Sequence, residues 1–258
     1  MTPGPAGNAV SYRVDWHDGL AVVHLSCGKA NALNPGSLAT IERALDDAEG
    51  RGARGVVLTG YARFFSAGLD LVHLYGLERD AMDGFMTWFD AVMLRVFAFP
   101  RPVVAAVSGH AVAGGAILAL ACDARVMGAD AGRFGLNEIR LGVPFPASAL
   151  EIVRYAVPAR AVEPVLYEGE LFEPRAALAH GLISEIAEGD VVAAARQACA
   201  RLAAAPTDAF ATIKAALKGP AVERARATLR PLREAFVDAW YAPEARRRIG
   251  EARVRLGG

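Results

Sequence analysis

The sequence has few of the features that mark secreted, metal-binding or membrane-spanning proteins. Its 258 residues include three cysteines, Cys27, Cys122 and Cys199, with no CxxC pair, which argues against a disulfide framework and a zinc site. The longest apolar run, residues 111–122, is too short and too rich in glycine to span a bilayer. The first five residues, MTPGP, lack the basic and apolar regions of a secretory signal. We therefore expect a cytoplasmic protein with free thiols, no metal ion and no membrane insertion.

The sequence also lacks an excess of charge of either sign. Lys plus Arg number 28 and Asp plus Glu number 28, so the formal net charge is zero. Such a chain has no general attraction to nucleic acid or to an anionic membrane, and any anionic ligand must be held by a local site. We expect no nucleic-acid partner. The GxGxxG dinucleotide fingerprint and the P-loop motif are both absent as well.

What the chain does contain is enough apolar sequence, 53% of its residues, to bury a large core. Its pattern alternates between strand and helix signals, which predicts an α/β fold. The expected strands are residues 11–16, 20–25, 55–60, 102–107, 124–127 and 182–186. The expected helices are residues 35–50, 69–75, 79–99 and 116–121, and the stretches 61–66, 109–115 and 134–143 are expected to be irregular.

The character of the sequence changes after Pro146, where strand signals become rare. From Val191 onward the chain is rich in Ala and Arg and has helical periodicity, with breaks expected at Pro206, Gly219-Pro220 and Pro243. We predict an α/β core over residues 1–195 and a C-terminal helical region over residues 196–258. The repeated strand and helix signals of the first part suggest successive similar layers.

Two glycine turns each follow a buried strand and lead toward a predicted short helix. The first is Ala67-Gly68-Leu69-Asp70 and the second is Ala113-Gly114-Gly115. The first N–H groups of a helix have no internal acceptor, and glycine allows a ligand to approach the backbone closely. Either turn alone is explained as well by tight packing. Two such turns converging on one oxygen would form an oxyanion hole.

Glu138 lies in a mostly apolar stretch, residues 134–144. An apolar setting disfavours a charged carboxylate and raises its pKa, which makes a glutamate a better proton shuttle near neutral pH. The alternatives are a salt bridge with Arg140 or an exposed position in a loop. Asn137 either caps the turn or orients the glutamate.

Taken in order, four segments resemble the crotonase family, also called the enoyl-CoA hydratase/isomerase superfamily. They are residues 31–34 (NALN), 65–70 (FSAGLD), 108–115 (SGHAVAGG) and 135–138 (GLNE). The resemblance covers about residues 20–186. It implies an α/β fold of stacked ββα units in a spiral, followed by a C-terminal helical region that helps to form a homotrimer or a hexamer.

The resemblance also implies site residues. The oxyanion hole would use the N–H groups of Leu69 and Gly114. Coenzyme A would enter as part of the acyl-CoA substrate, with no permanently bound cofactor, and Arg246 to Arg248 are candidates for its phosphates. The expected coenzyme A contacts are Lys29, Ala30, Ala32, Ala67, Asp70 and Leu71.

The expected acyl pocket includes Leu69, His73, Leu74 and Tyr75, although His73 could also face solvent. The stripe Met86, Trp88, Phe89 and Met93 either lines the pocket or belongs to the ordinary core. We expect a packing role for His110, and for Asp70 a place at a helix terminus or beside the adenine rather than a role as a base.

One position departs from the family pattern of hydratases, which use two glutamates. The first of these maps onto Ile117, which cannot exchange a proton, and the second maps onto Glu138. Migration of a double bond needs only one base, so the sequence favours a Δ3,Δ2-enoyl-CoA isomerase. The alternatives left open are enoyl-CoA hydration, another crotonase-type reaction, and a protein that binds acyl-CoA without catalysis.

Overall fold

The computed structural model describes residues 12–61 and 63–257, so Ser11, where the first strand was expected to begin, lies outside the described residues. In chain order the elements are β1 (Tyr12–His17), β2 (Leu20–Leu25), η1 (Lys29–Asn31), α1 (Pro35–Gly50), β3 (Gly55–Thr59), β4 (Phe64–Ser66), α2 (Leu71–Leu74), α3 (Arg79–Ala98), β5 (Val103–Val107), β6 (His110–Val112), α4 (Gly114–Ala121), β7 (Ala124–Gly128), β8 (Phe134–Gly135), α5 (Glu138–Leu141), α6 (Ala147–Ala156), α7 (Ala159–Glu168), β9 (Leu171–Phe172), α8 (Pro174–Ala179), β10 (Glu185–Ala187), α9 (Val191–Ala203), α10 (Thr207–Tyr241) and α11 (Pro243–Gly257).

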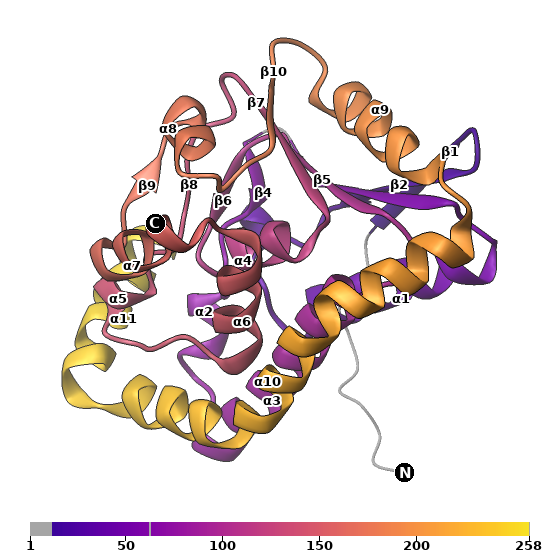
Figure 1. Cartoon of the computed structure of the whole chain (residues 1–258). Helices are drawn as coiled ribbons and strands as arrows, with labels where there is room; N and C mark the ends of the chain where they lie inside the picture. The colour runs from indigo at the N-terminus through magenta and orange to yellow at the C-terminus, as the bar shows by residue number, and fades with distance from the viewer. Residues whose placement is uncertain (1–11, 62, 258) are drawn as a thin grey trace.

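The larger sheet has six strands in the order β1-β2-β3-β5-β7-β10. All of its pairings are parallel except the β1–β2 hairpin. Every residue of β3 and β5 is buried, which explains why both strands are continuous apolar runs in the sequence. Helix α9 covers one face of this sheet (Figure 1) through the small buried side chains Ala195, Ala198 and Cys199.

The smaller sheet has the order β4-β6-β8-β9, and its first three strands run parallel. Each pair of consecutive strands, β3–β4, β5–β6 and β7–β8, places its first strand in the large sheet and its second in the small sheet before a helix follows. This is the predicted repetition of ββα units, and it confirms the expected spiral. Because β4, β6 and β8 are parallel neighbours, the segments that follow them meet at one edge of the small sheet.

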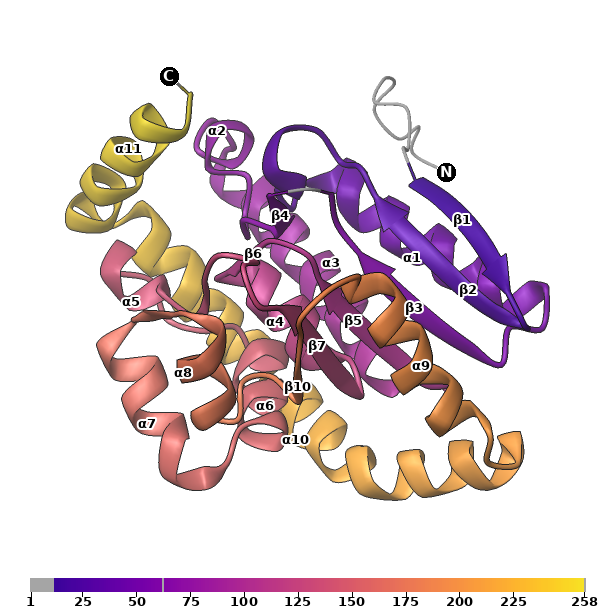
Figure 2. The same ribbon diagram turned by 90° about the horizontal axis from the view of Figure 1, so that it is seen from above.

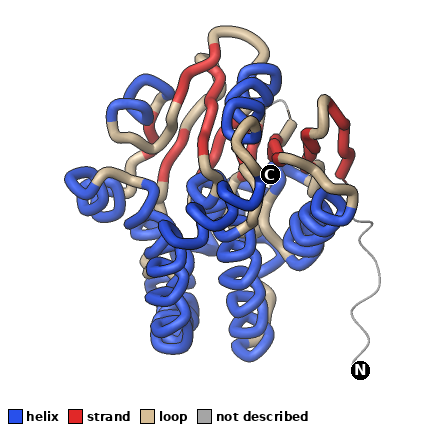
Figure 3. Tube along the Cα trace, turned by 45° about the vertical axis from the view of Figure 1, so that its right-hand side comes forward, coloured by secondary structure: helices blue, strands red, loops and turns tan. Residues whose placement is uncertain are grey.

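The long helices pack against one another beside the sheets (Figure 3). Helix α10 lies along α3 and against α6, and α11 folds back toward α2 and α5 (Figures 1 and 2). Helix α1 begins with a capping box, in which Asn34 and Ser37 each accept a hydrogen bond from the other's backbone N–H, and Pro35 follows the cap. None of the described helices is long and apolar enough to cross a lipid bilayer.

The break expected at Gly219-Pro220 is wrong, because α10 continues through these residues and through Pro231. A proline inside a helix costs roughly 3 kcal/mol. Tertiary packing of the neighbouring buried residues Ala221, Val222 and Ala225 offsets this cost. The breaks at Pro206 and Pro243 are confirmed, since α10 follows the first and α11 begins at the second.

The stretches expected to be irregular contain short ordered elements. Residues 61–66 include β4, residues 109–115 include β6, and residues 134–143 include β8 and α5. Strands of two or three residues give too short a pattern to recognise in a sequence. Residue 195 falls inside α9, and the division into regions at that point stays a prediction.

Candidate active site

The first glycine turn follows β4 and is held against the chain near Leu33. Leu33 N–H donates to the carbonyl of Gly68 at 2.7 Å, and Asp70 N–H donates to the carbonyl of Leu33 at 2.9 Å. Successive backbone groups of an extended chain point in alternate directions, so this pairing turns the N–H of Leu69 away from Leu33. Within the part of the chain that the structure describes, the Leu69 N–H has no acceptor.

A helix was expected over residues 69–75, but it does not begin at Leu69. Helix α2 starts at Leu71, and Asp70 caps it by accepting the His73 N–H at 3.0 Å. The other carboxylate oxygen of Asp70 accepts from Asn34 Nδ2 at 3.0 Å. The expectation that Asp70 occupies a helix terminus is confirmed, and both of its oxygens are engaged.

The second glycine turn follows β6 and opens α4 at Gly114, two residues earlier than expected. Ala113 precedes it with a φ of 50° and a ψ of −125°, a strained conformation for a residue with a Cβ. The Ala113 N–H donates to the carbonyl of Gly135 at 2.8 Å and fixes the turn on β8. Gly114 is the first residue of the helix, so its N–H has no acceptor inside α4.

The two turns lie against each other. A Cβ added to Gly68, whose φ is +85°, would lie 3.0 Å from the Gly114 nitrogen and 2.8 Å from the carbonyl oxygen of Val112. A Cβ on Gly114 would lie 3.1 Å from Leu33 Cδ1. Glycine is required at Gly68 both for its backbone conformation and for this close approach. The arrangement brings two donor segments together, as an oxyanion hole requires.

Glu138 is the first residue of α5, after β8, and is only 7% exposed. Burial raises the pKa of Glu138 to about 8, partly opposed by a hydrogen bond from its own backbone N–H. Its Oε2 has no hydrogen-bond partner among the described residues. Arg140 instead donates to the carbonyl of Glu168, so the salt-bridge and exposed-loop alternatives for Glu138 are wrong.

Asn137 occupies the N-cap position of α5 but makes no side-chain capping hydrogen bond, so its suggested capping role is wrong. Its Oδ1 is buried and has no partner in the described part of the chain. Two oxygens without donors, on Asn137 and Glu138, therefore occur side by side in the sequence. Buried acceptors without partners are uncommon in folded proteins, and a ligand that donates to them is one physical reason for keeping them.

A cavity of about 880 Å³ joins these features. Its lining includes all nine residues expected as oxyanion donors, proton shuttle or coenzyme A contacts: Leu69, Gly114, Glu138, Lys29, Ala30, Ala32, Ala67, Asp70 and Leu71. Ile117 also lines it and is 1% exposed, so an apolar side chain occupies the wall where hydratases of the family are expected to have their first glutamate. Among the described residues, no group of three or more His, Cys, Asp or Glu side chains is placed to hold a metal ion.

The segment carrying Lys29 and Ala30 bends sharply at the edge of the cavity. Gly28, Ala30 and Asn31 have φ values of 68°, 61° and 48°. The buried Asn31 side chain holds the bend, because it accepts from the Cys27 N–H at 2.7 Å and donates to the carbonyl of Leu25 at 3.0 Å. The expected coenzyme A contacts thus lie on one irregular rim, and their contact with the ligand stays a prediction.

Only some of the residues expected in the acyl pocket line the cavity. Met86, Phe89 and His73 line the cavity, whereas Leu74, Tyr75, Trp88 and Met93 are not among the lining residues. His110 lines the cavity too, and its Nδ1 accepts the Arg133 N–H while its ring packs on Phe64 at 5.4 Å, as a packing role requires.

Part of the cavity wall comes from the C-terminal helices, which was not predicted from the sequence. Phe236 and Trp240 of α10 and Ala252 and Arg255 of α11 all line the cavity. The spacing of Phe236 and Trp240, four residues apart, was a signal of one apolar helix face. The candidate phosphate ligands Arg246 to Arg248 are not among the lining residues, and Arg247 and Arg248 pair with Glu244.

Known proteins have similar sequences and the same fold. The chain matches the enoyl-CoA hydratase/isomerase family over residues 15–249. A probable enoyl-CoA hydratase of Bacillus subtilis is 31% identical over 247 residues, 94% of each chain. A putative enoyl-CoA hydratase of Thermus thermophilus is 42% identical over 163 residues, which are 62% of this chain and 64% of the relative.

Among solved structures, the human mitochondrial Δ3,Δ2-enoyl-CoA isomerase superposes with a TM-score of 0.90 at 27% identity, covering 95% of this chain and 98% of the human chain. The fold is therefore the α/β crotonase fold, with two mixed sheets and C-terminal helices. The chain belongs to the enoyl-CoA hydratase/isomerase family, which acts on acyl-CoA substrates. Since relatives include named hydratases and isomerases, the family alone does not define the reaction.

Proposed function

We propose that the protein is a Δ3,Δ2-enoyl-CoA isomerase that uses Glu138 as its proton shuttle. One observation carries the proposal. Glu138 lines the cavity with a buried oxygen that has no hydrogen-bond partner, and among the described residues no second carboxylate of the lining is without partners. The other carboxylate of the lining, Asp70, is occupied by α2 and Asn34. Ile117 supplies no proton donor.

The reaction follows from these groups. The thioester oxygen of a 3-enoyl-CoA accepts hydrogen bonds from Leu69 N–H and Gly114 N–H. Ionised Glu138 removes a proton from C2, and the electron pair of that bond moves into a dienolate whose oxygen the two amides stabilise. The protonated Glu138 then returns the proton to C4, and the double bond ends between C2 and C3. No atom is gained or lost, and no resident cofactor is needed.

The raised pKa of Glu138 suits both halves of this cycle. A carboxyl group with a pKa of about 8 holds a proton between two carbon atoms more readily than an ordinary glutamate. The apolar walls formed by Ile117, Phe89 and Met86 keep water from the dienolate and leave room for a hydrocarbon chain. The expected oligomer, a homotrimer or hexamer, and the expected cytoplasmic location remain predictions.

The test is turnover of a 3-enoyl-CoA, followed by the rise in absorbance of the conjugated 2-enoyl thioester. We expect this activity in the unaltered protein and its loss in Glu138→Gln. No absorbance change with any 3-enoyl chain length, from a folded protein that binds the thioester, would contradict the proposal and favour a non-catalytic binding role.

Hydration is the second candidate, because the Bacillus subtilis and Thermus thermophilus relatives have names of hydratases. It predicts that a 2-enoyl-CoA loses its conjugated absorbance as water adds at C3. With Glu138 alone, one group must both deprotonate the water and protonate C2. We therefore expect hydration, if measured, to be at least about 10²-fold slower than isomerisation, the contribution of one missing acid or base.

A further inference from the structure

Helix α11 lines the cavity with Ala252 and Arg255 and contacts two segments that lie next to the catalytic groups. On one side, Arg246 Nη1 donates to the carbonyl of Tyr75, immediately after α2, at 3.0 Å. On the other side, Arg248 Nη1 donates to the carbonyl of Arg140 in α5 at 3.3 Å. Helix α2 follows Leu69 and α5 begins at Glu138, so α11 joins the segment beside the oxyanion donors to the segment that carries the glutamate.

The contact on the α2 side is built around the ring of Tyr75. The guanidinium carbon of Arg246 lies 3.6 Å from the ring centroid, and that of Arg253 lies 4.3 Å from it. These arginines are seven residues apart, about 10 Å along a helix, so one ring contacts side chains from two successive turns of α11. Gly250 lies between the two arginines on the same helix face, and a Cβ there would be only 3.4 Å from the Tyr75 hydroxyl oxygen.

Two further contacts, both made by Tyr241, lie beside the contact between α2 and α11. Tyr241, at the end of α10, donates its hydroxyl hydrogen to the carbonyl of Leu77 at 2.6 Å, and its ring lies 5.5 Å from the Arg246 guanidinium. By contrast, the ion pairs of Arg247 with Glu244 and Glu251 stay within α11 and contribute nothing to its docking. The docking of α11 therefore combines guanidinium stacking on Tyr75 with the burial of Ala245 and Ile249, which are 3% and 0% exposed.

We propose that Tyr75 is a positioning residue that holds α11 over the cavity and thereby retains the acyl-CoA thioester. The proposal rests on the proposed function only in taking an acyl-CoA thioester as the ligand. Tyr75 is not among the lining residues, whereas Ala252 and Arg255 of α11 and Val72 of α2 are. Removing the ring loosens α11 beyond the buried Ala245 and Ile249, opens the wall that Ala252 and Arg255 form, and weakens ligand binding without altering Leu69, Gly114 or Glu138.

The first measurement is cleavage of α11 by trypsin, which needs no turnover because the helix is rich in arginine. Tyr75→Leu is expected to raise the cleavage rate within α11 about tenfold, the effect of about 1.4 kcal/mol on the docking equilibrium. Tyr75→Phe keeps the ring, and the Tyr75 hydroxyl has no hydrogen-bond partner among the described residues, so its rate is expected to stay within twofold of the original. Tyr167→Leu, at a 67% exposed position on α7, is the matched control and should change nothing.

The second measurement is the affinity for octanoyl-CoA, a saturated thioester that cannot react, together with kcat and KM for a 3-enoyl-CoA. Tyr75→Leu is expected to raise the dissociation constant and KM about tenfold and to leave kcat within twofold. A general loss of structure would instead lower kcat and the melting temperature together. Should Tyr75→Leu fail to fold, Arg253→Met removes one side of the stack together with one trypsin site, so cleavage is followed only after Arg246, Arg247 and Arg248 in both proteins. That cleavage and the affinity are expected to shift about threefold in the same directions.

The proposal is overturned if Tyr75→Leu is cleaved by trypsin at the original rate and binds octanoyl-CoA with the original affinity. It is also overturned if Tyr75→Phe is as impaired as Tyr75→Leu. Absence of octanoyl-CoA binding would overturn its claim about the ligand, while the cleavage rates would still decide the docking of α11. If octanoyl-CoA binds and the variants behave as expected but no 3-enoyl-CoA is isomerised, the proposed function fails and the role of Tyr75 stands.

Discussion

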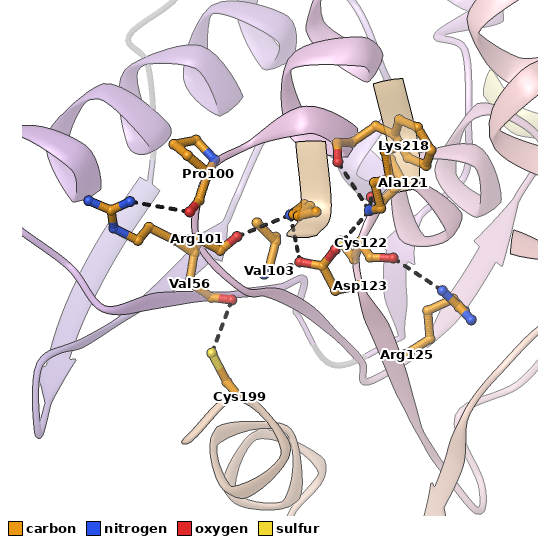
Figure 4. Close-up of polar contacts among 12 residues, drawn as sticks. Val56, Pro100, Arg101, Val103, Ala121, Cys122, Asp123, Arg125, Cys199 and Lys218 are labelled. Atoms are coloured by element: carbon orange, nitrogen blue, oxygen red, sulfur yellow. Dashed lines mark hydrogen bonds and ion pairs between the residues drawn. The ribbon is translucent and has the colours of Figure 1, made fainter. Parts of the chain in front are cut away.

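Two carboxylates of this molecule are almost equally buried, and they differ in every other respect. Asp123, whose side chain is 11% exposed, accepts hydrogen bonds from Lys214 and Lys218 at 2.7 Å each and from the Val103 N–H at 2.8 Å (Figure 4). Glu138, at 7% exposed, faces the cavity with one oxygen unpartnered. The first accepts from three donors, whereas the second has only its own backbone N–H and one oxygen without a partner.

The difference separates a structural carboxylate from a reactive one. Lys218 also donates to the carbonyls of Phe97 and Ala121, so the Asp123 cluster fastens α10 to the ends of α3 and α4. The two ammonium groups give Asp123 a structural role. Glu138 has no cationic partner in the described residues, so its buried charge is costly when present and its proton is available for chemistry.

The largest effect is expected from Glu138→Gln, which keeps the shape and removes the base. We predict a loss of isomerase activity of about 10²–10⁴-fold, measured as kcat/KM for a 3-enoyl-CoA, with no loss of thermal stability. Glu188→Gln, at an exposed position, is the control and should retain full activity. A Glu138→Gln enzyme within tenfold of the original rate would remove Glu138 from the mechanism.

Asp123→Asn should lower stability and leave the catalytic rate of the folded protein unchanged. It leaves two buried ammonium groups without their counter-charge, so we predict a loss of about 3–5 kcal/mol in the free energy of unfolding, measured with denaturant. The folded fraction should keep its kcat. Asp130→Asn, a nearby exposed position, should change stability by less than about 0.5 kcal/mol. An Asp123→Asn variant that unfolds at the original denaturant concentration would show that the cluster is not structural.

The pH dependence of stability should reveal the cost of ionising Glu138. Its pKa is raised from 4.5 unfolded to about 8 folded, so between these values the folded state binds more protons and stability falls as pH rises. Glu138→Gln should not lose stability in this way, because a glutamine side chain does not ionise. We predict that the variant equals the original near pH 4.5 and becomes more stable by a few kcal/mol, in order of magnitude, at pH 8. Parallel stability curves over that range would contradict the raised pKa.

Lys214 should show the opposite slope at higher pH. Burial lowers its pKa from 10.5 to about 8, although Asp123 opposes the shift. Between pH 8 and 10.5 the unfolded state therefore binds more protons, and stability rises with pH. Relative to Lys214→Met, the original protein is predicted to gain on the order of 2–3 kcal/mol across this window in denaturant titrations. A constant difference between the two proteins would show that Lys214 titrates normally.

The last prediction concerns the pH dependence of the rate. Because only ionised Glu138 can accept the C2 proton, kcat/KM should rise about tenfold per pH unit below the free enzyme's pKa of about 8 and level off above it. Initial rates from pH 6 to 9.5 would measure this profile. A profile that is flat from pH 6 to 9 would mean that Glu138 is already ionised at pH 6 or takes no part.

The sequence predicted the long elements and the order of the motifs, because apolar runs such as residues 55–59 and 103–107 carry a clear pattern. The apolar neighbours of Glu138 suggested its burial, but they left a salt bridge with Arg140 or an exposed position equally open. The sequence could not predict β4, β6 and β8, since two or three residues show no periodicity, and yet their parallel pairing brings Leu69, Gly114 and Glu138 together.

The sequence also could not show how α10 and α11 return to the cavity. The proline at 220 suggested a break, and only tertiary packing overrides it. Phe236 and Trp240 reach the cavity because α10 is one continuous helix. Tyr75, expected in the acyl pocket, instead stacks on α11, a contact between residues more than 170 positions apart that no local pattern contains.

The central claim, that one shielded carboxyl carries a proton from C2 to C4, can be tested with a 3-enoyl-CoA that has deuterium on both C2 positions. The account predicts that the product formed in ordinary water during a single turnover retains part of the transferred deuterium at C4, measured by NMR or mass spectrometry. A product with only solvent hydrogen at C4 after one turnover would contradict the single-shuttle mechanism.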